Sequence, residues 1–456
     1  MEMIRVQEII LENFKNIERG SIEFGSINNM EDFFEESKIL GIYGQNGSGK
    51  TSIIEGMEII KLLLSGDKLP HNTLDFISKG KDNMTITITL LVENEHIIKL
   101  LEYSVNISKK LSLLDDKEIL IPEISEILKL KEYKDDSWTR KKILIQTSGK
   151  NIKPIGISQN LDLIELTVAK KLSEKSNSSF IFSNDLIELI IKNKSYFKEL
   201  IENINFLKKY GKRNLYIINN REISLINTNI MIPLNFRYEE NNSISQGVIP
   251  IYLNESTFLK NKEFKIIQGV IEKMNIALES LIPNLNINII ELEKGLTKNM
   301  EEGVYIKLTS KKGDLEIPLE YESDGIKKIV SILGTLIATY NDPNFNLFID
   351  EFDATIFEYL LGEILQIMEK FAQGQLVFTS HNLRPLEVLE PRHLRFTITD
   401  SNNKYIKIPN VKATNNLRNI YFKEIFLDEK KLGLYKGNSN SKIRKSFSRA
   451  GGILHG

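Results

Sequence analysis

The first hundred residues contain three stretches in which apolar and polar residues alternate. They cover residues 4–24, 84–92 and 97–107, and the first is interrupted by a turn at 13–16. A period of two places successive side chains on opposite faces of a strand. Each stretch therefore predicts strand structure near the N-terminus.

Two segments between these strands predict a different local structure. The short apolar run 39–43 is typical of a strand buried on both faces. A glycine-rich segment follows it, and the apolar residues of 51–64 then recur at the spacing of one helix face. The pattern predicts a buried strand, a loop and a helix in succession.

The middle of the chain differs in composition from both ends. Residues 111–284 are rich in Lys and Glu and contain pieces with a helical period, such as 185–209. Polar breaks fall at 173–179 and 239–247. No heptad pattern continues for the three or four repeats that a coiled coil requires. We expect a mostly helical insertion here.

Strand patterns return near residue 285 and then alternate with helical ones. The predicted elements are strands at 285–292 and 304–308, a helix at 325–340, a strand at 345–349, a helix at 357–371 and a strand at 375–379. Alternating strands and helices indicate an α/β unit with a parallel sheet. We therefore predict an α/β fold with a mixed or parallel sheet, interrupted by the helical insertion.

Composition and charge exclude several classes of protein. The chain has 456 residues, and 60 Lys and Arg balance 61 Asp and Glu, so no global field favours nucleic acid or an anionic membrane. The absence of Cys excludes disulfides and thiolate sites. The N-terminus lacks a signal-peptide pattern, and the apolar stretch 329–340 is shorter than the roughly 20 residues of a membrane span. We expect a soluble, cytoplasmic protein with no membrane contact.

The strongest chemical signal is a glycine-rich loop between the buried strand and the helix. Residues 44–51 match the phosphate-binding pattern G-x4-G-K-[ST] in full. The glycines allow successive N–H groups to face an anion, and the following helix adds its positive end. Lys50 is placed to contact the β- and γ-phosphates, and Thr51 to hold Mg²⁺. The predicted nucleotide-binding residues are Gly44, Gln45, Asn46, Gly47, Ser48, Gly49, Lys50, Thr51 and Ser52.

A second signal is an apolar strand that ends in two carboxylates. Residues 347–349 lead directly into Asp350 and Glu351, and Asn346 stands where a fourth apolar residue is usual. Taken alone, acidic residues at a strand end are ordinary. Together with the phosphate loop they predict that Asp350 joins Thr51 on Mg²⁺ and that Glu351 polarises the attacking water.

Two further short segments fit the same chemistry. His381 follows the apolar strand 375–379, where an imidazole could reach a γ-phosphate; a surface histidine is the alternative. The turn 321–328 contains Ser323 and Gly325 and opens a helix, which is also an ordinary N-cap arrangement.

Together, these four segments resemble the ABC-type ATPase superfamily, on the branch of SMC, RecF and OLD-like proteins. The resemblance implies ATP with Mg²⁺, held by Walker A at 44–51 and Walker B at 347–350, with Glu351, His381 and Lys50 catalytic. It also implies a head-to-tail homodimer or higher homo-oligomer. In that dimer Ser323 and Gly325 form a signature motif that touches the ATP of the other subunit, and 353–355 form a contact loop.

Three features depart from the pattern of this superfamily. The turn at Ser323 is not of the usual LSGGQ type. No glutamine loop is identifiable, which leaves Gln146 and Gln159 unassigned, and Phe357 stands where many relatives carry histidine. These departures bear on the rate of turnover more than on nucleotide binding.

The resemblance divides the chain into four parts. They are an N-terminal ATPase lobe at 1–110, an insertion for sensing or docking a partner at 111–284, a C-terminal ATPase lobe at 285–400, and an extension with a basic tail at 401–456. The tail is either a nucleic-acid-binding segment or a solvated terminus. It holds Lys430, Lys431, Lys436, Lys442, Arg444, Lys445 and Arg449.

The opening segment LENFKNI (11–17) further resembles the OLD-like ATPases of prokaryotic anti-phage and abortive-infection systems. This implies an ATP-driven switch that acts as the sensor or scaffold of a defence system and controls a separate effector protein. Two alternatives remain. One is a RecF-like DNA-repair clamp, and the other is a nucleotide-dependent scaffold with negligible turnover.

Overall fold

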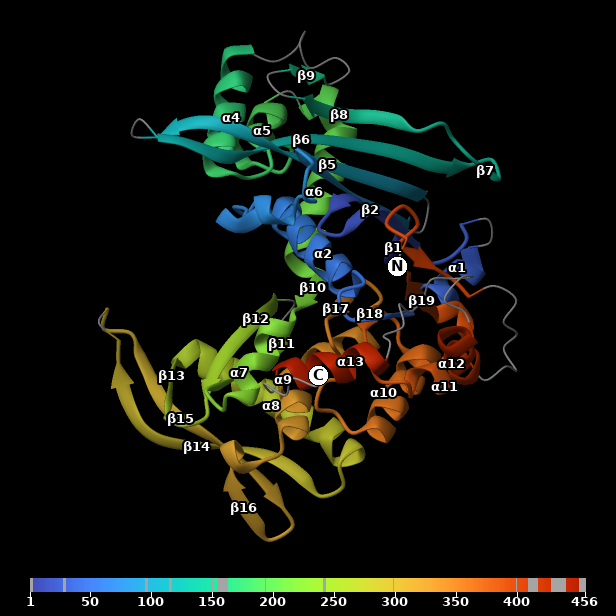
Figure 1. Ribbon diagram of the computed structural model, residues 1–456. Coiled ribbons are helices and arrows are strands. Elements are labelled where there is room, and N and C mark those ends of the chain that lie inside the picture. Colours follow the sequence, from blue (N-terminus) through green and yellow to red (C-terminus); the bar gives the residue numbers. More distant parts are fainter. Residues whose placement is uncertain are drawn as a thin grey trace.

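The computed structural model describes most of the chain and shows two large sheets. The described residues are 3–27, 30–94, 97–114, 117–148, 151–153, 163–192, 194–240, 243–297, 299–398, 400–408, 417–427 and 440–450. In Figure 1 an antiparallel sheet lies at the top, a mainly parallel sheet lies in the middle, and a group of hairpins extends to the lower left. No helix in these ranges is long and apolar enough to cross a membrane.

The antiparallel sheet contains the predicted N-terminal strands. Its order is β2-β1-β4-β5-β6-β8-β9, with β7 paired to β6. The strands are β1 (Met3–Phe14), β2 (Ile17–Glu23), β4 (Asn83–Asn94), β5 (Ile97–Leu114), β6 (Lys117–Lys134), β7 (Ser137–Trp138), β8 (Lys142–Ser148) and β9 (Asn151–Lys153). Strand β5 crosses the expected lobe boundary at residue 110.

The mostly helical character expected from residue 111 onward is wrong for 117–148, which are strands of this sheet. The Lys- and Glu-rich composition suggested helix, but β6 has the period of a strand. Glu126, Leu128 and Leu130 are buried, while Ile127 and Lys129 between them are more exposed. Alternating burial of this kind requires extended backbone. Cross-strand pairing therefore outweighed the helix propensity of Lys and Glu.

The mainly parallel sheet has the order β10-β17-β18-β3-β19-β20, in which only β20 is antiparallel to its neighbour. Its strands are β3 (Ile39–Tyr43), β10 (Leu215–Ile218), β17 (Asn346–Ile349), β18 (Gln375–Thr379), β19 (Leu394–Thr397) and β20 (Tyr405–Ile406). The predicted α/β class with a mixed parallel sheet is confirmed. Strand β10 comes from the expected insertion, so that segment rejoins the sheet beside β17.

The remaining elements cover the two sheets and form smaller ones. Strands β11 (Met231–Glu240) and β12 (Ser243–Tyr252) form a hairpin, and β13 (Thr257–Lys260), β14 (Leu285–Leu296), β15 (Glu302–Lys312) and β16 (Leu315–Pro318) form a fourth sheet. The helices are α1 (Met30–Glu36), α2 (Lys50–Ser65), α4 (Leu163–Ser176), α5 (Asn184–Ile191), α6 (Lys194–Arg213), α7 (Asn220–Asn227), α8 (Asn261–Leu281), α9 (Asp324–Asn341), α10 (Glu358–Phe371), α11 (Pro385–Val388), α12 (Leu417–Leu427) and α13 (Asn440–Ala450).

The parallel sheet separates two hydrophobic cores. Alternate residues of β3 face opposite sides, so Leu40 and Ile42 join the core that holds α2, α6 and the antiparallel sheet. Ile39 and Tyr43 join the core that holds α8, α9 and α10. Both faces of the sheet are covered, as the continuous apolar run of β3 predicts.

Asn346 is the polar residue that departs from the apolar Walker B pattern, and its burial has a structural reason. Its side-chain oxygen accepts a hydrogen bond from the Tyr210 hydroxyl at 2.8 Å, and its side-chain nitrogen reaches the Ile4 carbonyl at 3.4 Å. A buried amide is tolerated when its donor and acceptor are both satisfied. Asn346 thus links α6 and β1 to the start of β17.

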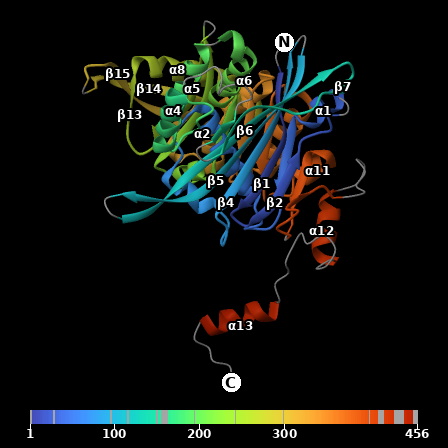
Figure 2. The same cartoon turned by 90° about the horizontal axis from the view of Figure 1, so that it is seen from above.

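The basic tail is described in part. Helix α13 carries Lys442, Arg444, Lys445 and Arg449 and lies away from the rest of the chain in Figure 2. Lys430, Lys431 and Lys436 lie outside the described residues. The choice between a nucleic-acid segment and a solvated terminus stays open.

Candidate functional site

The phosphate-binding loop connects β3 to α2 and depends on glycine at two positions. Gly44 has φ 153°, and a Cβ there would lie 1.7 Å from the Thr397 hydroxyl oxygen. Gly49 has φ 104° and is the N-cap of α2. Only glycine adopts the first position without a clash. The loop therefore ends at the positive end of a buried helix, where an anion is favoured.

Residues distant in sequence hold this loop in place. The Thr397 hydroxyl donates to the Tyr43 carbonyl at 3.1 Å and contacts the Ser48 hydroxyl. The Tyr405 hydroxyl donates to the Gly49 carbonyl at 2.7 Å, and Asn16 donates to the Gly47 carbonyl at 2.6 Å. No short sequence pattern marks these supports, because their role exists only after β19, β20 and the turn between β1 and β2 lie beside the loop.

Lys50 lies over the loop, with its ammonium group near the loop carbonyls. Its Nζ donates to the carbonyls of Gly44 at 2.8 Å and Gln45 at 3.1 Å. Burial lowers the pKa of Lys50, while the carboxylates of Asp350 and Glu351 oppose that shift. The ammonium is thus placed between the loop and the acidic end of β17.

Asp350 lies beneath the start of α2 and offers a free oxygen for a cation. Its Oδ1 accepts hydrogen bonds from Thr379 at 2.6 Å and from Thr51 at 3.2 Å. Among the described residues its buried Oδ2 has no hydrogen-bond partner. One carboxylate oxygen and one hydroxyl are hard oxygen ligands, which fit Mg²⁺ held mainly by phosphates and water.

Glu351 follows in a strained backbone conformation that the sequence did not predict. Its φ is 47°, in the left-handed region, and Thr355 in the same loop has φ 66°. The Glu351 N–H donates to the Thr379 hydroxyl at 2.8 Å, which stabilises this geometry. Non-glycine residues in this region are costly and cluster at functional sites. The Thr379 hydroxyl therefore holds both the Asp350 carboxylate and the backbone that carries Glu351.

His381 lies at the end of β18 beside the same loop. The Asp353 carboxylate accepts hydrogen bonds from the backbone N–H groups of His381 at 3.1 Å and Asn382 at 2.9 Å. Asp353 thereby fixes the backbone that carries the imidazole. This contact joins the loop after Walker B to His381.

A cavity of about 890 Å³ lies at the carboxyl ends of the parallel strands, and of the predicted residues Gly44, Gln45, Ser48 and Asp350 lie behind its lining. Carboxyl strand ends are the usual ligand-binding edge of an open α/β sheet. Of the predicted site, Asn46, Gly47, Gly49, Lys50, Thr51, Ser52, Glu351 and His381 line it. Lys15, Asn16, Glu55 and Thr379 line it as well. Lys15 and Glu55 pair at 2.5 Å on one side of the cavity.

The predicted signature residues lie elsewhere. Neither Ser323 nor Gly325 lines this cavity. The Ser323 hydroxyl caps α9 by accepting from the Ile326 N–H at 3.3 Å. Gly325 packs so closely on the Thr355 carbonyl that a Cβ would lie 2.5 Å from it. Gln146 lies in β8 and does not line the cavity, and Gln159 is outside the described residues.

Lys328 is a buried cation behind the site that sequence reasoning missed. It is 1% exposed, and burial lowers its pKa to about 8, while Glu222 and Asp350 oppose the shift. Among the described residues no carboxylate lies within 4.0 Å of its ammonium. The helical period of α9 was the available signal, since 328 lies one turn before the buried positions Ile332 and Thr335 on the same helix face.

Comparison with known proteins gives one family. The chain matches the family described as "AAA domain, putative AbiEii toxin, Type IV TA system" over residues 39–387. No curated protein shows a significant sequence match.

Solved structures of ATPase heads align with the chain at low identity. An Smc head bound to the C-winged helix domain of ScpA is 12% identical, with 89% of this chain and 98% of that chain covered, at a TM-score of 0.45. The SMC head domain of Thermotoga maritima is 15% identical, with 89% and 99% covered, at 0.38. RecF bound to ATP is 12% identical, with 84% and 95% covered, at 0.35.

The family match includes every motif of the site. It begins at the first residue of β3 and extends past His381, so the phosphate loop, Asp350 and Glu351 all fall inside it. It also covers more than half of the sequence. The predicted P-loop ATPase family is thus confirmed, and the chain belongs to the AAA-domain family of the AbiEii type.

Proposed function

We propose that the chain is an ATP-hydrolysing switch that controls a separate effector in a prokaryotic anti-phage defence system. One observation carries the proposal. Thr51, Glu351 and His381 line the cavity at the phosphate loop, and the Asp350 carboxylate beneath them accepts from the Thr51 hydroxyl at 3.2 Å and keeps one oxygen unpartnered among the described residues. The description of the family, which names a toxin–antitoxin system, supports the defence context.

Each residue has a distinct task in this proposal. The N–H groups of 44–51 and the Lys50 ammonium bind the phosphates of ATP. Thr51 and Asp350 hold Mg²⁺, which neutralises charge on the phosphate oxygens. Glu351 orients the attacking water and accepts its proton, and His381 donates a hydrogen bond to the γ-phosphate. Thr379 positions Asp350 and Glu351 through its hydroxyl.

The position of Ser323 and Gly325 supports a site completed by a second subunit. They lie at the start of α9, outside the cavity that holds Lys50. A head-to-tail homodimer would bring this turn onto the ATP of the partner. The close contact of Gly325 with the Thr355 carbonyl would then couple the signature turn to the loop that follows Glu351.

A second candidate is a scaffold that binds ATP but hydrolyses it negligibly. The observation that favours it is the use of the Ser323 hydroxyl as the helix cap of α9. A hydroxyl engaged in this way is less available to a γ-phosphate. The intact Glu351 and His381 favour hydrolysis.

Steady-state ATP hydrolysis at several protein concentrations tests the proposal. Specific activity should rise with concentration, because the site needs two subunits, and should vanish in Glu351→Gln while ATP binding persists. Absent turnover in the wild-type chain, despite measurable ATP binding, would favour the scaffold. ATP-stimulated binding to DNA ends by the chain alone would favour a RecF-like clamp.

A further inference from the structure

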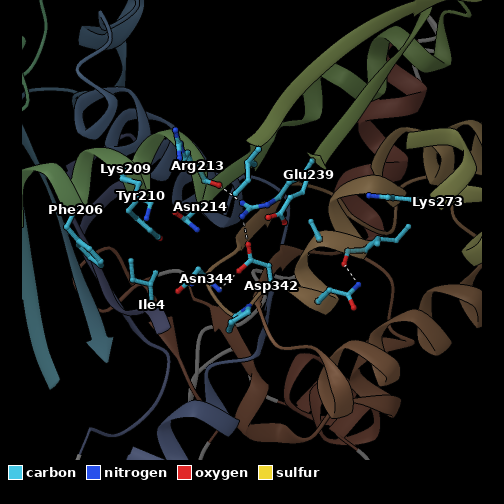
Figure 3. A pocket seen from close by; sticks show the side chains of 16 residues that line it. Ile4, Phe206, Lys209, Tyr210, Arg213, Asn214, Glu239, Lys273, Asp342 and Asn344 are labelled. Atoms are coloured by element: carbon cyan, nitrogen blue, oxygen red, sulfur yellow. Dashed lines mark hydrogen bonds and ion pairs between the residues drawn. The ribbon is translucent and has the colours of Figure 1, made fainter. Parts of the chain in front are cut away.

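A second cavity lies at the opposite edge of the parallel sheet from the nucleotide site. Its volume is about 600 Å³, and it is bordered by α6, α8, the C-terminal end of α9, the β11–β12 hairpin and Ile4 of β1 (Figure 3). Strands β10 and β17 begin here and end at the nucleotide site. A cavity of this size accepts a ligand as large as a nucleotide.

Three cations line this second cavity, and the ammonium of one of them, Lys273, also lies over the Tyr238 ring at 4.7 Å. Lys209 and Arg213 are four residues apart on α6, so their side chains share one helix face. Lys273 comes from α8 on the other side (Figure 3). None of the three has a carboxylate within 4.0 Å in the described part of the chain, and Glu239 is the one unpaired acid of the lining. The excess of positive charge matches a dianion such as a phosphomonoester.

The basic residues are not needed to cap the helices that end here. Helix C-termini attract cations because their last carbonyls lack partners. In this case Gln246 donates to the Lys212 carbonyl at 2.7 Å, and Gly374 donates to the Thr339 carbonyl at 2.8 Å. Other groups already satisfy these carbonyls. Lys209 and Arg213 are therefore available to a ligand.

The floor of the second cavity is fixed and largely apolar. The Arg237 guanidinium pairs with Asp342 and lies over the Phe345 ring at 4.9 Å. Ile4, Ile337 and Ala338 supply apolar surface. Apolar surface beside a few charged or polar groups is the usual construction of a small-molecule site.

One polar atom of the lining lacks a partner. The Asn344 side-chain oxygen is buried and accepts no hydrogen bond among the described residues, although its backbone N–H donates to Asp342 at 2.8 Å. A buried acceptor without a donor is unfavourable, and a ligand hydroxyl or amino group would satisfy it. The ligand is thus expected to carry a donor as well as a phosphate.

We infer that this second cavity binds a phosphorylated small molecule of the nucleoside monophosphate class. Its phosphate contacts Lys209, Arg213 and Lys273, its flat or apolar part lies on Ile337 and Ala338, and a donor meets Asn344. Binding here needs no hydrolysis and so stands independently of the proposed ATPase activity.

A regulatory consequence rests on the proposed function. Asp342 is the C-cap of α9, and Ser323 is its N-cap. The 18 residues between them span about 27 Å. A ligand in this cavity lies against the C-terminal end of α9, and the N-terminal end of the same helix carries the signature turn. Binding can therefore shift that turn through the helix.

Calorimetric titration of the full chain with adenosine 5′-monophosphate, in saturating Mg²⁺ and ADP, tests the inference. We expect saturable binding that is at least tenfold weaker for adenosine, which lacks the phosphate. Arg213→Glu and Lys273→Glu should each weaken the binding at least tenfold. The matched control, Lys212→Glu, reverses the same charge one position away on α6 outside the lining and should change it less than twofold.

Three outcomes of the titrations with the monophosphate would overturn the inference, and a fourth comes from an oligonucleotide. They are no binding of the monophosphate, binding unaffected by both cavity variants, or binding that disappears in Lys50→Ala, which would place the ligand in the nucleotide site. A 5′-phosphorylated oligonucleotide that binds more tightly than the monophosphate and loses affinity in the same variants would also overturn it, in favour of nucleic acid. The thermal unfolding midpoints of Arg213→Glu, Lys273→Glu and Lys212→Glu should match that of the wild type, which shows that the variants are folded.

Discussion

The two ends of the parallel sheet gather positive charge in different ways. At the carboxyl ends of the strands, a contiguous loop uses backbone N–H groups and one lysine, Lys50. At the amino ends, the cations come from α6 and α8, which are far apart in sequence. The first arrangement is encoded locally and appears as a motif. The second exists only after the chain folds, so no short sequence pattern could indicate it.

The largest expected effect is the loss of nucleotide binding in Lys50→Ala. This variant removes the cation that lies over the loop carbonyls, and ATP affinity should fall at least 100-fold in a fluorescence titration. Lys212→Ala, an exposed lysine on α6, is the control and should bind like the wild type. Tight ATP binding by the Lys50 variant would refute the assignment of the nucleotide site.

Gly44→Ala should disable the same site through sterics instead of charge. The added methyl group would lie 1.7 Å from the Thr397 hydroxyl oxygen, so β19 or the loop must move. We expect a clear loss of ATP affinity, smaller than that of Lys50→Ala, and a thermal midpoint lower by several degrees. Gly47→Ala is the matched control, because a Cβ there meets nothing within 4 Å and the cost is limited to about 1 kcal/mol of backbone strain. An equal loss of ATP affinity in both variants would contradict the steric role assigned to Gly44.

Lys328→Met should stabilise the protein. The lysine pKa falls from 10.5 unfolded to about 8 folded, so the unfolded chain binds more protons between these values. The free energy of unfolding of the wild type should therefore rise with pH across that window. Below pH 8 the buried ammonium of Lys328 should lower it by its full amount, about 3 kcal/mol. Denaturant unfolding at pH 7 should give the variant a higher free energy of unfolding than the wild type. Between pH 7 and pH 10 the free energy of unfolding of the variant should lack the rise that Lys328 causes in the wild type. A loss of stability at pH 7 would instead mean that the buried ammonium has an effective partner.

The smallest effect separates the two cavities. Lys209→Glu changes the amino-end cavity only, and in the absence of added monophosphate its ATP affinity should stay within twofold of the wild type. The same titration used for Lys50→Ala measures it. A tenfold loss of ATP affinity would show that charge in the second cavity affects nucleotide binding at the other end of the sheet.

The elements next to the phosphate loop were predictable because their signals are local. The predicted segments 39–43 and 375–379 coincide with β3 and β18, and α2 begins one residue before the predicted helix. Residues 44–51 form the loop itself. Each of these depends on hydrophobic periodicity and glycine placement within a few positions.

The rest depends on pairing between distant segments. Strand β6 is rich in Lys and Glu and is extended because β5 and β8 pair with it. Strand β10 is recognisable as part of the nucleotide-binding sheet only beside β17. Thr379 is an unremarkable strand residue in the sequence, yet its hydroxyl orients Asp350 and Glu351. Such roles require the tertiary structure.

The place of β3 in the sheet has a consequence for biosynthesis. Its neighbours are β18 and β19, and the Thr397 hydroxyl that supports the loop is 354 residues beyond Tyr43. At roughly 5 to 20 residues per second, a ribosome needs about 20 to 70 s to make that segment. During this interval the apolar strand and its loop have no sheet to join. The phosphate loop therefore gains the neighbouring strands and the hydroxyl that support it only after residue 397 has been made.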